Sequence, residues 1–259
     1  MPSHMILLQS IGKGGVNDKG DILSYQNTAA FLSKELLNPN LYPGPIDGIY
    51  GRATQDSIEE LQRVFLFRRV DGLINVGGYT HERATRLVKI CNLPLVFPFT
   101  TSSKYPYMGV GAGMRAFGAN RSGNRSHAAI DIYQPYRTVI HSVYDGIVAR
   151  DEYSYYAKTN ALQVDHGLFT AVYGEIDPGS AMVGKGDKVK KGQPIAKVGH
   201  LVGISVPSAM LHFEMYDNTE EGAIGQNEAY NPRNGRAFRR RRDLMDPSPF
   251  MKKAPLINT

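Results

Sequence analysis

The sequence predicts an α+β protein of two domains, a small N-terminal helical bundle followed by an antiparallel all-β domain. Two observations support this fold class. Apolar residues recur at helical spacing before residue 92, whereas short β-branched or aromatic stretches alternate with Gly, Asp and Pro from Ala128 onward. The 27 Gly, 15 Pro and 15 Tyr argue against a purely helical protein. We expect the helical domain at 5–92, a linker at 93–107 and the β domain at 108–253.

Length and composition exclude several classes of protein. The chain has 259 residues, of which 42% are hydrophobic and 21% charged, so it can bury a core. A single cysteine, Cys91, excludes an internal disulfide scaffold. No stretch approaches the roughly 18 apolar residues of a membrane-spanning helix, and the apolar run 5–8 is too short for a signal-peptide core. We expect a protein made in the cytoplasm without a signal peptide and without stable membrane association.

The chain carries a formal net charge of +6, which favours attraction to polyanions such as nucleic acid, anionic lipid or a bacterial wall. The densest basic run is 239–242. It is interpreted either as a nucleic-acid-binding arm or as a solvated surface run. Nothing around it resembles a known nucleic-acid reader, so we expect the surface run and no nucleic-acid partner.

Helical periodicity in the first domain predicts amphipathic helices at 22–37, 53–67 and 80–90. Asp21 is the expected N-cap of the first helix, and Thr54 is the expected N-cap of the second. Pro-Gly and Asp-Gly pairs between the helices predict tight turns. No internal repeat is expected anywhere in the chain.

The turn before the second helix carries a recognisable motif. Residues 45–54 read Pro-Ile-Asp-Gly-Ile-Tyr-Gly-Arg-Ala-Thr, and a second Asp-Gly pair follows at 71–72. This pattern resembles the small helical peptidoglycan-binding domain of wall hydrolases over about residues 10–92. The resemblance implies four substrate-binding residues, namely Asp47, Gly48, Tyr50 and Thr54. The alternative is a helix-loop-helix domain whose glycines only permit positive φ.

The second domain contains the stretches from which an antiparallel sheet is expected. The predicted strands are 128–133, 138–143, 146–150, 161–164, 169–173, 194–198 and 211–216.

Two histidines and one carboxylate are the usual protein ligands of a catalytic zinc. His127 and Asp131 form an H-x-x-x-D pattern, and an offset of four residues on a strand puts both side chains on one face. His212 lies within another apolar strand, at 211–216. Each histidine taken alone is more often an ordinary hydrogen-bonded residue. Together they predict a site for one Zn²⁺ per chain.

Five motifs in order strengthen this interpretation. They are Arg-x-His-x-x-x-Asp at 125–131, Asp-Gly-x-Val at 145–148, Val-Asp-His-Gly at 164–167, Val-Lys-Lys-Gly-Gln-x-Ile-Ala-x-Val-Gly at 189–199 and Leu-His-Phe-Glu at 211–214. Over about 108–250 the chain resembles the lysostaphin-type (LytM-like) zinc metallopeptidases. The resemblance implies a compact β domain with a narrow groove, zinc ligands at His127, Asp131 and His212, and hydrolysis of peptide bonds in bacterial peptidoglycan.

The chain departs from the family pattern at two positions. The family has His-x-His before Phe-Glu, and Met210 stands at the first of these histidines. A second family histidine, which follows Tyr-x, is replaced by Glu175. A glutamate beside zinc can act as a general base, so we expect Glu175 to take that catalytic role. His166 is a second catalytic candidate, although Asp-His-Gly at a strand end is as often structural.

The combined expectation is a peptidoglycan hydrolase that cuts peptide cross-links with zinc-activated water while its N-terminal domain holds the wall. Lack of a signal peptide and the order of the domains resemble a phage endolysin, made in the host cytoplasm and acting on the cell wall. A monomer is expected. The alternative is a catalytically inactive wall-binding or activator protein of the same fold, because relatives of this family lose catalytic histidines.

Overall fold

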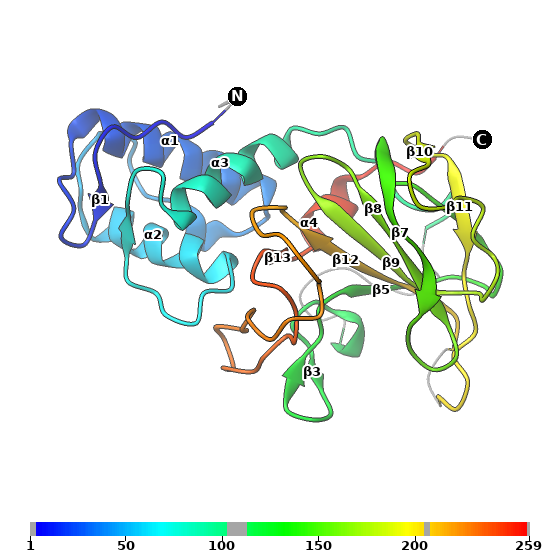
Figure 1. Cartoon of the computed structure of the whole chain (residues 1–259). Helices are drawn as coiled ribbons and strands as arrows, with labels where there is room; N and C mark the ends of the chain where they lie inside the picture. Colours follow the sequence, from blue (N-terminus) through cyan, green and yellow to red (C-terminus); the bar gives the residue numbers. More distant parts are fainter. Residues whose placement is uncertain (1–3, 103–112, 205–207, 258–259) are drawn as a thin grey trace. The chain divides into compact units, whose positions relative to one another are not determined.

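The computed structural model describes residues 4–102, 113–204 and 208–257. They fold into two compact units, Met1–Leu93 with Thr219–Met245 and Pro94–Asn218 with Asp246–Thr259 (Figure 1). The predicted end of the linker at 107 and start of the β domain at 108 lie outside the described residues. Within the described ranges, no helix is both long enough and apolar enough to cross a membrane.

Three α-helices form the first unit, at positions close to the predicted ones. They are α1 (Lys19–Glu35), α2 (Arg52–Val64) and α3 (Tyr79–Cys91), with a 3-10 turn, η1 (Pro39–Leu41), and a two-stranded sheet of β1 (Ile11–Gly12) and β2 (Leu73–Ile74). Each helix buries an apolar face, and Ile22, Ile58 and Val88 are fully buried. Burial of these faces, more than helix propensity, stabilises helices of this length.

Both predicted N-caps are wrong. Asp18, not Asp21, caps α1, because its side chain accepts a hydrogen bond from the Gly20 amide. The Asp21 carboxylate instead accepts from the amides of the preceding segment, at Leu8 and Gln9. In α2 the N-cap is a glycine without a side-chain cap, and Thr54 lies inside the first turn of the helix.

A buried glutamine on α1 holds the turn that precedes α2. The Gln26 side-chain oxygen accepts from the amides of Asp47 and Gly48 at 3.1 and 2.8 Å. Its amide nitrogen donates to the Asp47 carboxylate at 3.2 Å and to the Thr54 hydroxyl at 3.3 Å. Since unpaired amides are costly to bury, this clamp fixes the Asp-Gly turn on the helix.

The same arrangement occurs again one helix later, which corrects the expectation of no internal repeat. Gln62 on α2 accepts from the amides of Asp71 and Gly72 at 3.1 and 2.9 Å. It donates to the Asp71 carboxylate at 2.7 Å and to the Thr80 hydroxyl at 3.5 Å. The repeat is structural: a helix glutamine, an Asp-Gly turn and a threonine in the first turn of the next helix.

Residues 219–245 pack with the helices, an arrangement that the sequence did not reveal. Arg83 of α3 is fully buried and donates to the carbonyl oxygens of Arg242 and Leu244 at 3.1 and 3.2 Å. It also donates to the Phe65 carbonyl oxygen at 2.7 Å. A buried guanidinium with carbonyl partners in both segments explains why this part of the chain joins the first unit.

The basic run 239–242 is not a fully solvated surface run, contrary to expectation. Arg241 is buried and forms a bidentate pair with Asp243 at 2.7 and 2.8 Å. The Arg242 guanidinium lies 4.1 Å from the centroid of the Tyr79 ring. Two of the four arginines are therefore part of the packing of the first unit.

The second unit is built on one antiparallel sheet. The strands lie in the order β10 (Lys188–Val189), β7 (Gly146–Ser154), β8 (Asn160–Asp165), β9 (Thr170–Ile176) and β12 (Met210–Tyr216), and β5 (Ile130–Tyr133) also pairs with β12 (Figure 1). Two further pairs join β6 (Val139–His141) to β11 (Pro194–Lys197) and β3 (Asn120–Arg121) to β4 (Arg125–Ser126). The short helices are η2 (Gly113–Arg115) and α4 (Ser248–Lys253).

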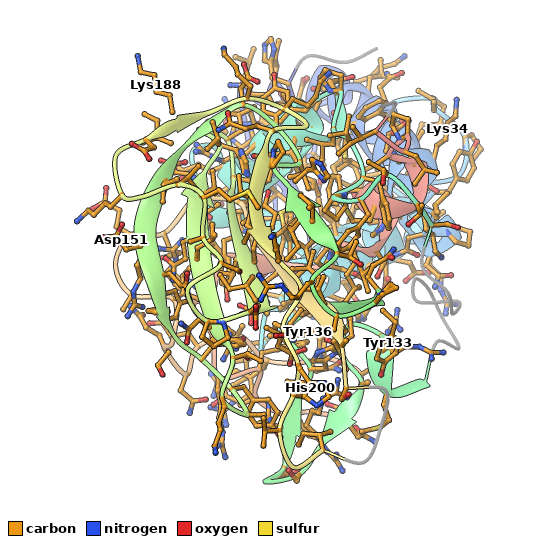
Figure 2. All side chains as sticks on the ribbon, turned by 90° about the vertical axis from the view of Figure 1, so that its right-hand side faces the viewer. Lys34, Tyr133, Tyr136, Asp151, Lys188 and His200 are labelled. Atoms are coloured by element: carbon orange, nitrogen blue, oxygen red, sulfur yellow. The ribbon has the colours of Figure 1, made fainter. Side chains whose placement is uncertain are left out.

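The sheet has a solvated edge and a buried centre. Lys188 of β10 and Asp151 of β7 are exposed and point away from the sheet (Figure 2). By contrast, every residue of β9 and β12 is buried. Polar side chains on these central strands are therefore held away from solvent, and the functional candidates His212 and Glu175 are among them.

Candidate metal centre

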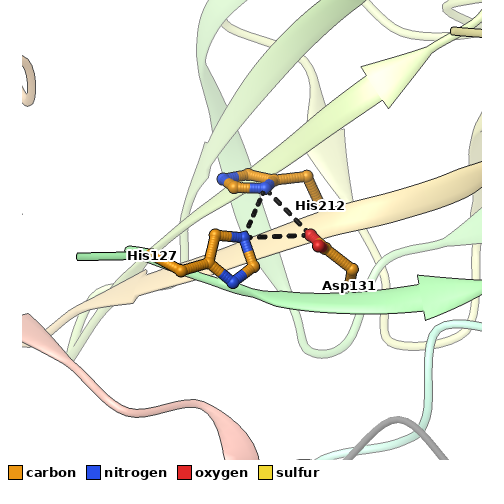
Figure 3. A group of neighbouring side chains, drawn as sticks. All are labelled: His127, Asp131 and His212. Atoms are coloured by element: carbon orange, nitrogen blue, oxygen red, sulfur yellow. Dashed lines mark hydrogen bonds and ion pairs between the residues drawn. The ribbon is translucent and has the colours of Figure 1, made fainter. Parts of the chain in front are cut away.

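His127, Asp131 and His212 converge on one point in the second unit (Figure 3). The Nε2 atom of His127 and the Nδ1 atom of His212 each lie 3.1 Å from Asp131 Oδ1. The two ring nitrogens lie 3.2 Å from each other. All three side chains are buried.

Strand pairing produces this convergence. His212 of β12 stands directly opposite Asp131 of β5, so the two side chains project from the same face of the sheet. His127 lies just before β5 and not on the strand, so the expected strand offset of four does not explain its position. Its Nδ1 atom donates to the Ala116 carbonyl oxygen at 3.0 Å, which turns Nε2 toward Asp131.

A second hydrogen bond orients His212. Its Nε2 atom donates to Glu214 Oε1 at 2.9 Å, leaving Nδ1 directed at the cluster. Glu214 in turn accepts from the hydroxyls of Tyr155, at 3.1 Å, and Tyr216. Each histidine thus donates its outer nitrogen to an oxygen and keeps its inner nitrogen for the cluster. Metal-ligating histidines have this arrangement.

The electrostatics of the cluster follow from burial and close contact. Burial lowers the pKa of His127, and the nearby Asp131 opposes that shift. Burial also acts on His212, but hydrogen bonds to Asp131 and Glu214 outweigh it and raise the pKa of His212 to about 9. Burial works against the Asp131 charge, yet the two histidines lower the pKa of Asp131 overall. The cluster therefore contains an ionised carboxylate.

These three atoms fit a zinc ion. Atoms bound to one zinc at about 2.0–2.2 Å in a tetrahedron lie roughly 3.3 Å from one another, close to the separations in the cluster. The donor set of two imidazole nitrogens and one carboxylate oxygen is the set expected for a catalytic zinc that keeps a further position for water. The outer nitrogens are already hydrogen-bonded to oxygens, so a cation that displaces the proton between His212 Nδ1 and Asp131 would meet a lone pair on both inner nitrogens.

Glu175 occupies a bulge beside the cluster, inside β9 and not after the strand as expected. Gly174 pairs with Ala161 and Ile176 with Asn160, so Glu175 is the extra residue of a β-bulge. Its φ is +63°, a left-handed conformation that costs a non-glycine residue roughly 1–2 kcal/mol. Bulges near active sites re-aim side chains, and this one gives Glu175 an unusual direction.

The Glu175 carboxylate is 7% exposed, so it is not a solvated turn residue. Its Oε2 atom has no hydrogen-bond partner among the described residues. Burial and the negative charge of Asp131 raise the pKa of Glu175 to about 8, while His212 and Arg121 oppose the shift. A pKa this high favours the protonated form at neutral pH in the metal-free chain, whereas a cation bound at the neighbouring cluster would favour the ionised form that a general base needs.

Met210 lies on the same face of β12 as His212, two residues along the strand, but contacts apolar side chains. It is 3% exposed and packs in a hydrophobic cluster with Tyr133 and Leu201. The position at which the family carries a histidine is therefore an apolar packing position in this chain.

The structure does not bring His166 to the cluster. His166 lies in the turn between β8 and β9, where its Nδ1 atom donates to the Asp145 carbonyl oxygen at 2.9 Å. The β9–β12 register puts Thr170 opposite Tyr216 and Gly174 opposite His212. Four residues of strand, roughly 13 Å, separate the turn from the level of His212. His166 thus has a packing role at the far end of the hairpin.

The four predicted substrate-binding residues lie in the first unit, on the Asp-Gly turn and α2. Asp47, Gly48 and Thr54 are bonded to Gln26, which gives each of them a structural role in the turn. The Tyr50 hydroxyl donates to the Gln55 side chain. Their role in wall binding stays a prediction.

Sequence reasoning missed three residues of the site. Glu214 belongs to the Leu-His-Phe-Glu motif, so the motif could have predicted its contact with His212. Tyr155 has no sequence signal, since it reaches Glu214 from a different hairpin. Arg121 donates to Asp131 Oδ2 at 3.2 Å. It lies in the β3–β4 hairpin, for which the sequence gives no signal beyond an arginine on each side of Ser-Gly-Asn.

Comparison with known proteins agrees with the resemblance predicted for the second domain. Residues 125–227 match peptidase family M23, and the matched span contains His127, Asp131, Glu175 and His212. This match supports a peptidase. No curated protein matches the chain.

Solved structures that match part of this chain include bacterial and prophage-encoded peptidases. The catalytic domain of the antimicrobial peptidase lysostaphin from Staphylococcus simulans is 21% identical, with a TM-score of 0.39, over 53% of this chain and 90% of that one. LytU is 27% identical, with a TM-score of 0.40, over 55% and 88%. A mutant catalytic domain of the prophage-encoded M23 protein EnpA from Enterococcus faecalis is 24% identical, with a TM-score of 0.36, over 51% and 95%.

The ligand geometry predicts one tightly held zinc per chain. Changing His212→Ala removes one of three ligands, so we expect the purified variant to hold less than about a tenth of the zinc of the wild type. Metal analysis by mass spectrometry measures this. His200→Ala is the control, because His200 is an exposed histidine of the same unit (Figure 2) and its loss leaves the zinc content unchanged. Full zinc in His212→Ala contradicts the ligand assignment.

His166 predicts a pH dependence of stability. Burial lowers its pKa to about 4 from 6.5, so the folded chain resists a proton that the unfolded chain accepts. The stability linked to neutral His166 is fully present above pH 6.5 and is lost as the pH falls toward 4, by up to about 3 kcal/mol. Chemical denaturation at pH 7 and pH 4 should show a smaller acid loss for His166→Gln than for wild type. An equal loss in both proteins contradicts the assignment.

Proposed function

We propose that this chain is a zinc metalloendopeptidase that cuts peptide bonds in bacterial peptidoglycan. The observation that carries the proposal is the convergence of His127 Nε2, His212 Nδ1 and Asp131 Oδ1 within 3.2 Å of one another. The three residues lie in a span that matches a peptidase family. A buried two-histidine, one-carboxylate cluster is the donor set of hydrolytic zinc enzymes.

Zinc bound there would lower the pKa of a water molecule and polarise the carbonyl oxygen of a peptide bond. Glu175 is the general base of the proposal. Its unpartnered Oε2 accepts the proton that the water loses as the water oxygen bonds to the carbonyl carbon. The proton then passes to the amine nitrogen as the carbon–nitrogen bond breaks. His166 takes no part, because its ring packs in the β8–β9 turn.

The helical unit supplies the wall-binding half of the proposal. Large apolar side chains are exposed around its first Asp-Gly turn, at Tyr42, Ile46 and Ile49. Isolated apolar residues on a surface are ordinary, but three beside the resemblance motif favour a binding surface. Attachment to an insoluble substrate raises the local enzyme concentration. The role of a phage endolysin, suggested by the order of binding and catalytic domains, is part of this proposal.

A catalytically inactive wall-binding or activator protein is the competing function. The loss of both family histidines, at Met210 and Glu175, favours it. The complete cluster with its oriented outer nitrogens favours an enzyme, because a scaffold has no need of this donor set. Incubation of the zinc-loaded chain with purified peptidoglycan, followed by mass spectrometry of released fragments, separates the two functions. Absence of new amine termini supports the inactive protein.

The base assignment predicts the effect of Glu175→Gln. The substitution keeps the shape and removes the basicity, so we expect normal zinc content and a loss of at least about 100-fold in the rate of peptidoglycan hydrolysis. His166→Ala is the matched comparison and should stay within about threefold of wild type at pH 7. If Glu175→Gln retains more than roughly a third of the activity while His166→Ala loses about 100-fold, the base is His166.

The wall-binding assignment predicts a defect in a full-length variant with Ile49→Ser and Tyr50→Ala. Loss of buried contact area from two such side chains should weaken binding to insoluble peptidoglycan by about tenfold or more. Co-sedimentation, with Glu175→Gln as the background to prevent hydrolysis, measures it. Leu8→Ser is the control, because Leu8 is a highly exposed apolar residue of the same unit. Equal binding by both variants removes the role of this turn.

A further inference from the structure

Arg121 contacts the metal cluster from its outer side. It ends the first strand of the β3–β4 hairpin and donates from Nη2 to Asp131 Oδ2 at 3.2 Å. The other oxygen of the same carboxylate, Oδ1, faces both histidines. Asp131 therefore links the guanidinium to the position where the three ligand atoms meet.

The second terminal nitrogen of Arg121 has no partner. Nη1 is buried and makes no hydrogen bond within the described residues. A buried charged donor without a partner is costly, and native proteins usually satisfy it. Other buried arginines of this chain do so: Arg83 donates to three carbonyl oxygens, and Arg241 forms a bidentate pair with Asp243.

The hairpin also holds two like charges against each other. Arg121 stands directly opposite Arg125 in the β3–β4 register, an unfavourable cross-strand pair. Unpaired buried donors and facing like charges disfavour a fold, and natural proteins keep such features most often at functional sites. A guanidinium retained here, despite burial and repulsion, suggests a ligand absent from the free chain.

The polarity of the site identifies this ligand. Hydrolysis of a peptide bond places negative charge on the carbonyl oxygen, and donors aimed at that oxygen stabilise the transition state. Met210 removes one histidine from this site and is buried in an apolar cluster. Arg121, which contacts Asp131, has the donor Nη1 without a hydrogen-bond partner, and Glu175 in the bulge of β9 has the acceptor Oε2 without one, among the described residues. The acceptor suits the attacking water, and the donor suits the carbonyl oxygen.

We propose that Arg121 Nη1 binds the carbonyl oxygen of the scissile peptide and stabilises the negative charge that develops on it, while Nη2 holds Asp131. The proposal rests on the proposed peptidase function. Arg121 exchanges no proton, because a guanidinium stays charged throughout. Its contribution is a hydrogen bond that is stronger in the transition state than to the substrate, so it acts on kcat more than on KM.

The test uses the full-length, zinc-saturated chain and the variant Arg121→Gln. We expect kcat for a cross-linked muropeptide to fall at least about 100-fold, with KM changed less than about threefold. A phosphinate analogue of the peptide, which carries a tetrahedral anion, should lose affinity by a similar factor. Zinc affinity, measured by competition with a chelator, should fall no more than about tenfold, as for loss of a ligand-orienting residue.

Arg125→Gln is the matched control. It removes the facing charge from the same hairpin without touching Asp131, so all three quantities should stay within about threefold of wild type. Millimolar guanidinium should restore part of the activity of Arg121→Ala, which a purely structural role of the residue does not predict.

The outcomes separate the two proposals. If wild type hydrolyses the muropeptide but Arg121→Gln binds the phosphinate as tightly as wild type, Arg121 does not contact the oxyanion. The same conclusion follows if the loss of activity matches the loss of zinc and disappears at zinc saturation. If wild type hydrolyses nothing, the peptidase function fails. In that case, phosphinate binding that is lost in Arg121→Gln still supports an anion site at Arg121. If wild type does not bind the phosphinate either, the anion site is overturned.

Discussion

One carboxylate, that of Asp131, organises the second unit. Its Oδ1 atom contacts the inner nitrogens of both histidines, and its Oδ2 atom accepts from Arg121. A buried carboxylate is stable here because hydrogen-bonding imidazoles and a positively charged guanidinium surround it. Three polar side chains of the site, those of His127, His212 and Arg121, are held by direct contact with this one residue.

The backbone around Asp131 is correspondingly fixed. β12 has a strand on each side near His212, with Asp131 opposite on β5 and Gly174 opposite on β9. Ladder hydrogen bonds on both edges prevent β12 from sliding, and a one-residue slip would turn His212 to the other face. Tyr155 and Glu214 then hold the ring from behind. These contacts position His212 through both the backbone and the side chain, as catalysis by preorganised groups requires.

The ligand set was accessible to sequence analysis because it depends on residue type and on short-range patterns. His127 and Asp131 lie four residues apart, and His212 stands in an apolar strand with a recognisable motif. Glu175 was placed by resemblance, but its bulge was not foreseen, since a bulge depends on the pairing of β9 with β8. Arg121 was missed altogether. Its role arises from a contact across the fold, to which no local pattern points.

In the first unit, periodicity located the helices to within a few residues but misassigned both caps. Asp21 matches the capping preference, yet the helix begins earlier and Asp18 takes the role. The association of 219–245 with the helices depends on Arg83, which lies on the buried face of α3 with Leu87 and Ile90 although arginine is usually exposed. Composition and spacing describe single elements well, whereas distant partners of long polar side chains require the assembled fold.

The two glutamine clamps hold the same turn geometry although the chain between each glutamine and its turn differs in length. Gln26 holds a turn 21 residues further along, and Gln62 holds an equivalent turn only 9 residues further along. The same hydrogen bonds close both loops, and loop-closure entropy grows only slowly with length. The longer connection, between α1 and the first Asp-Gly turn, is thus a place where evolution or an engineer can add or remove residues. New recognition surfaces can be grafted there while the helices on either side keep their positions.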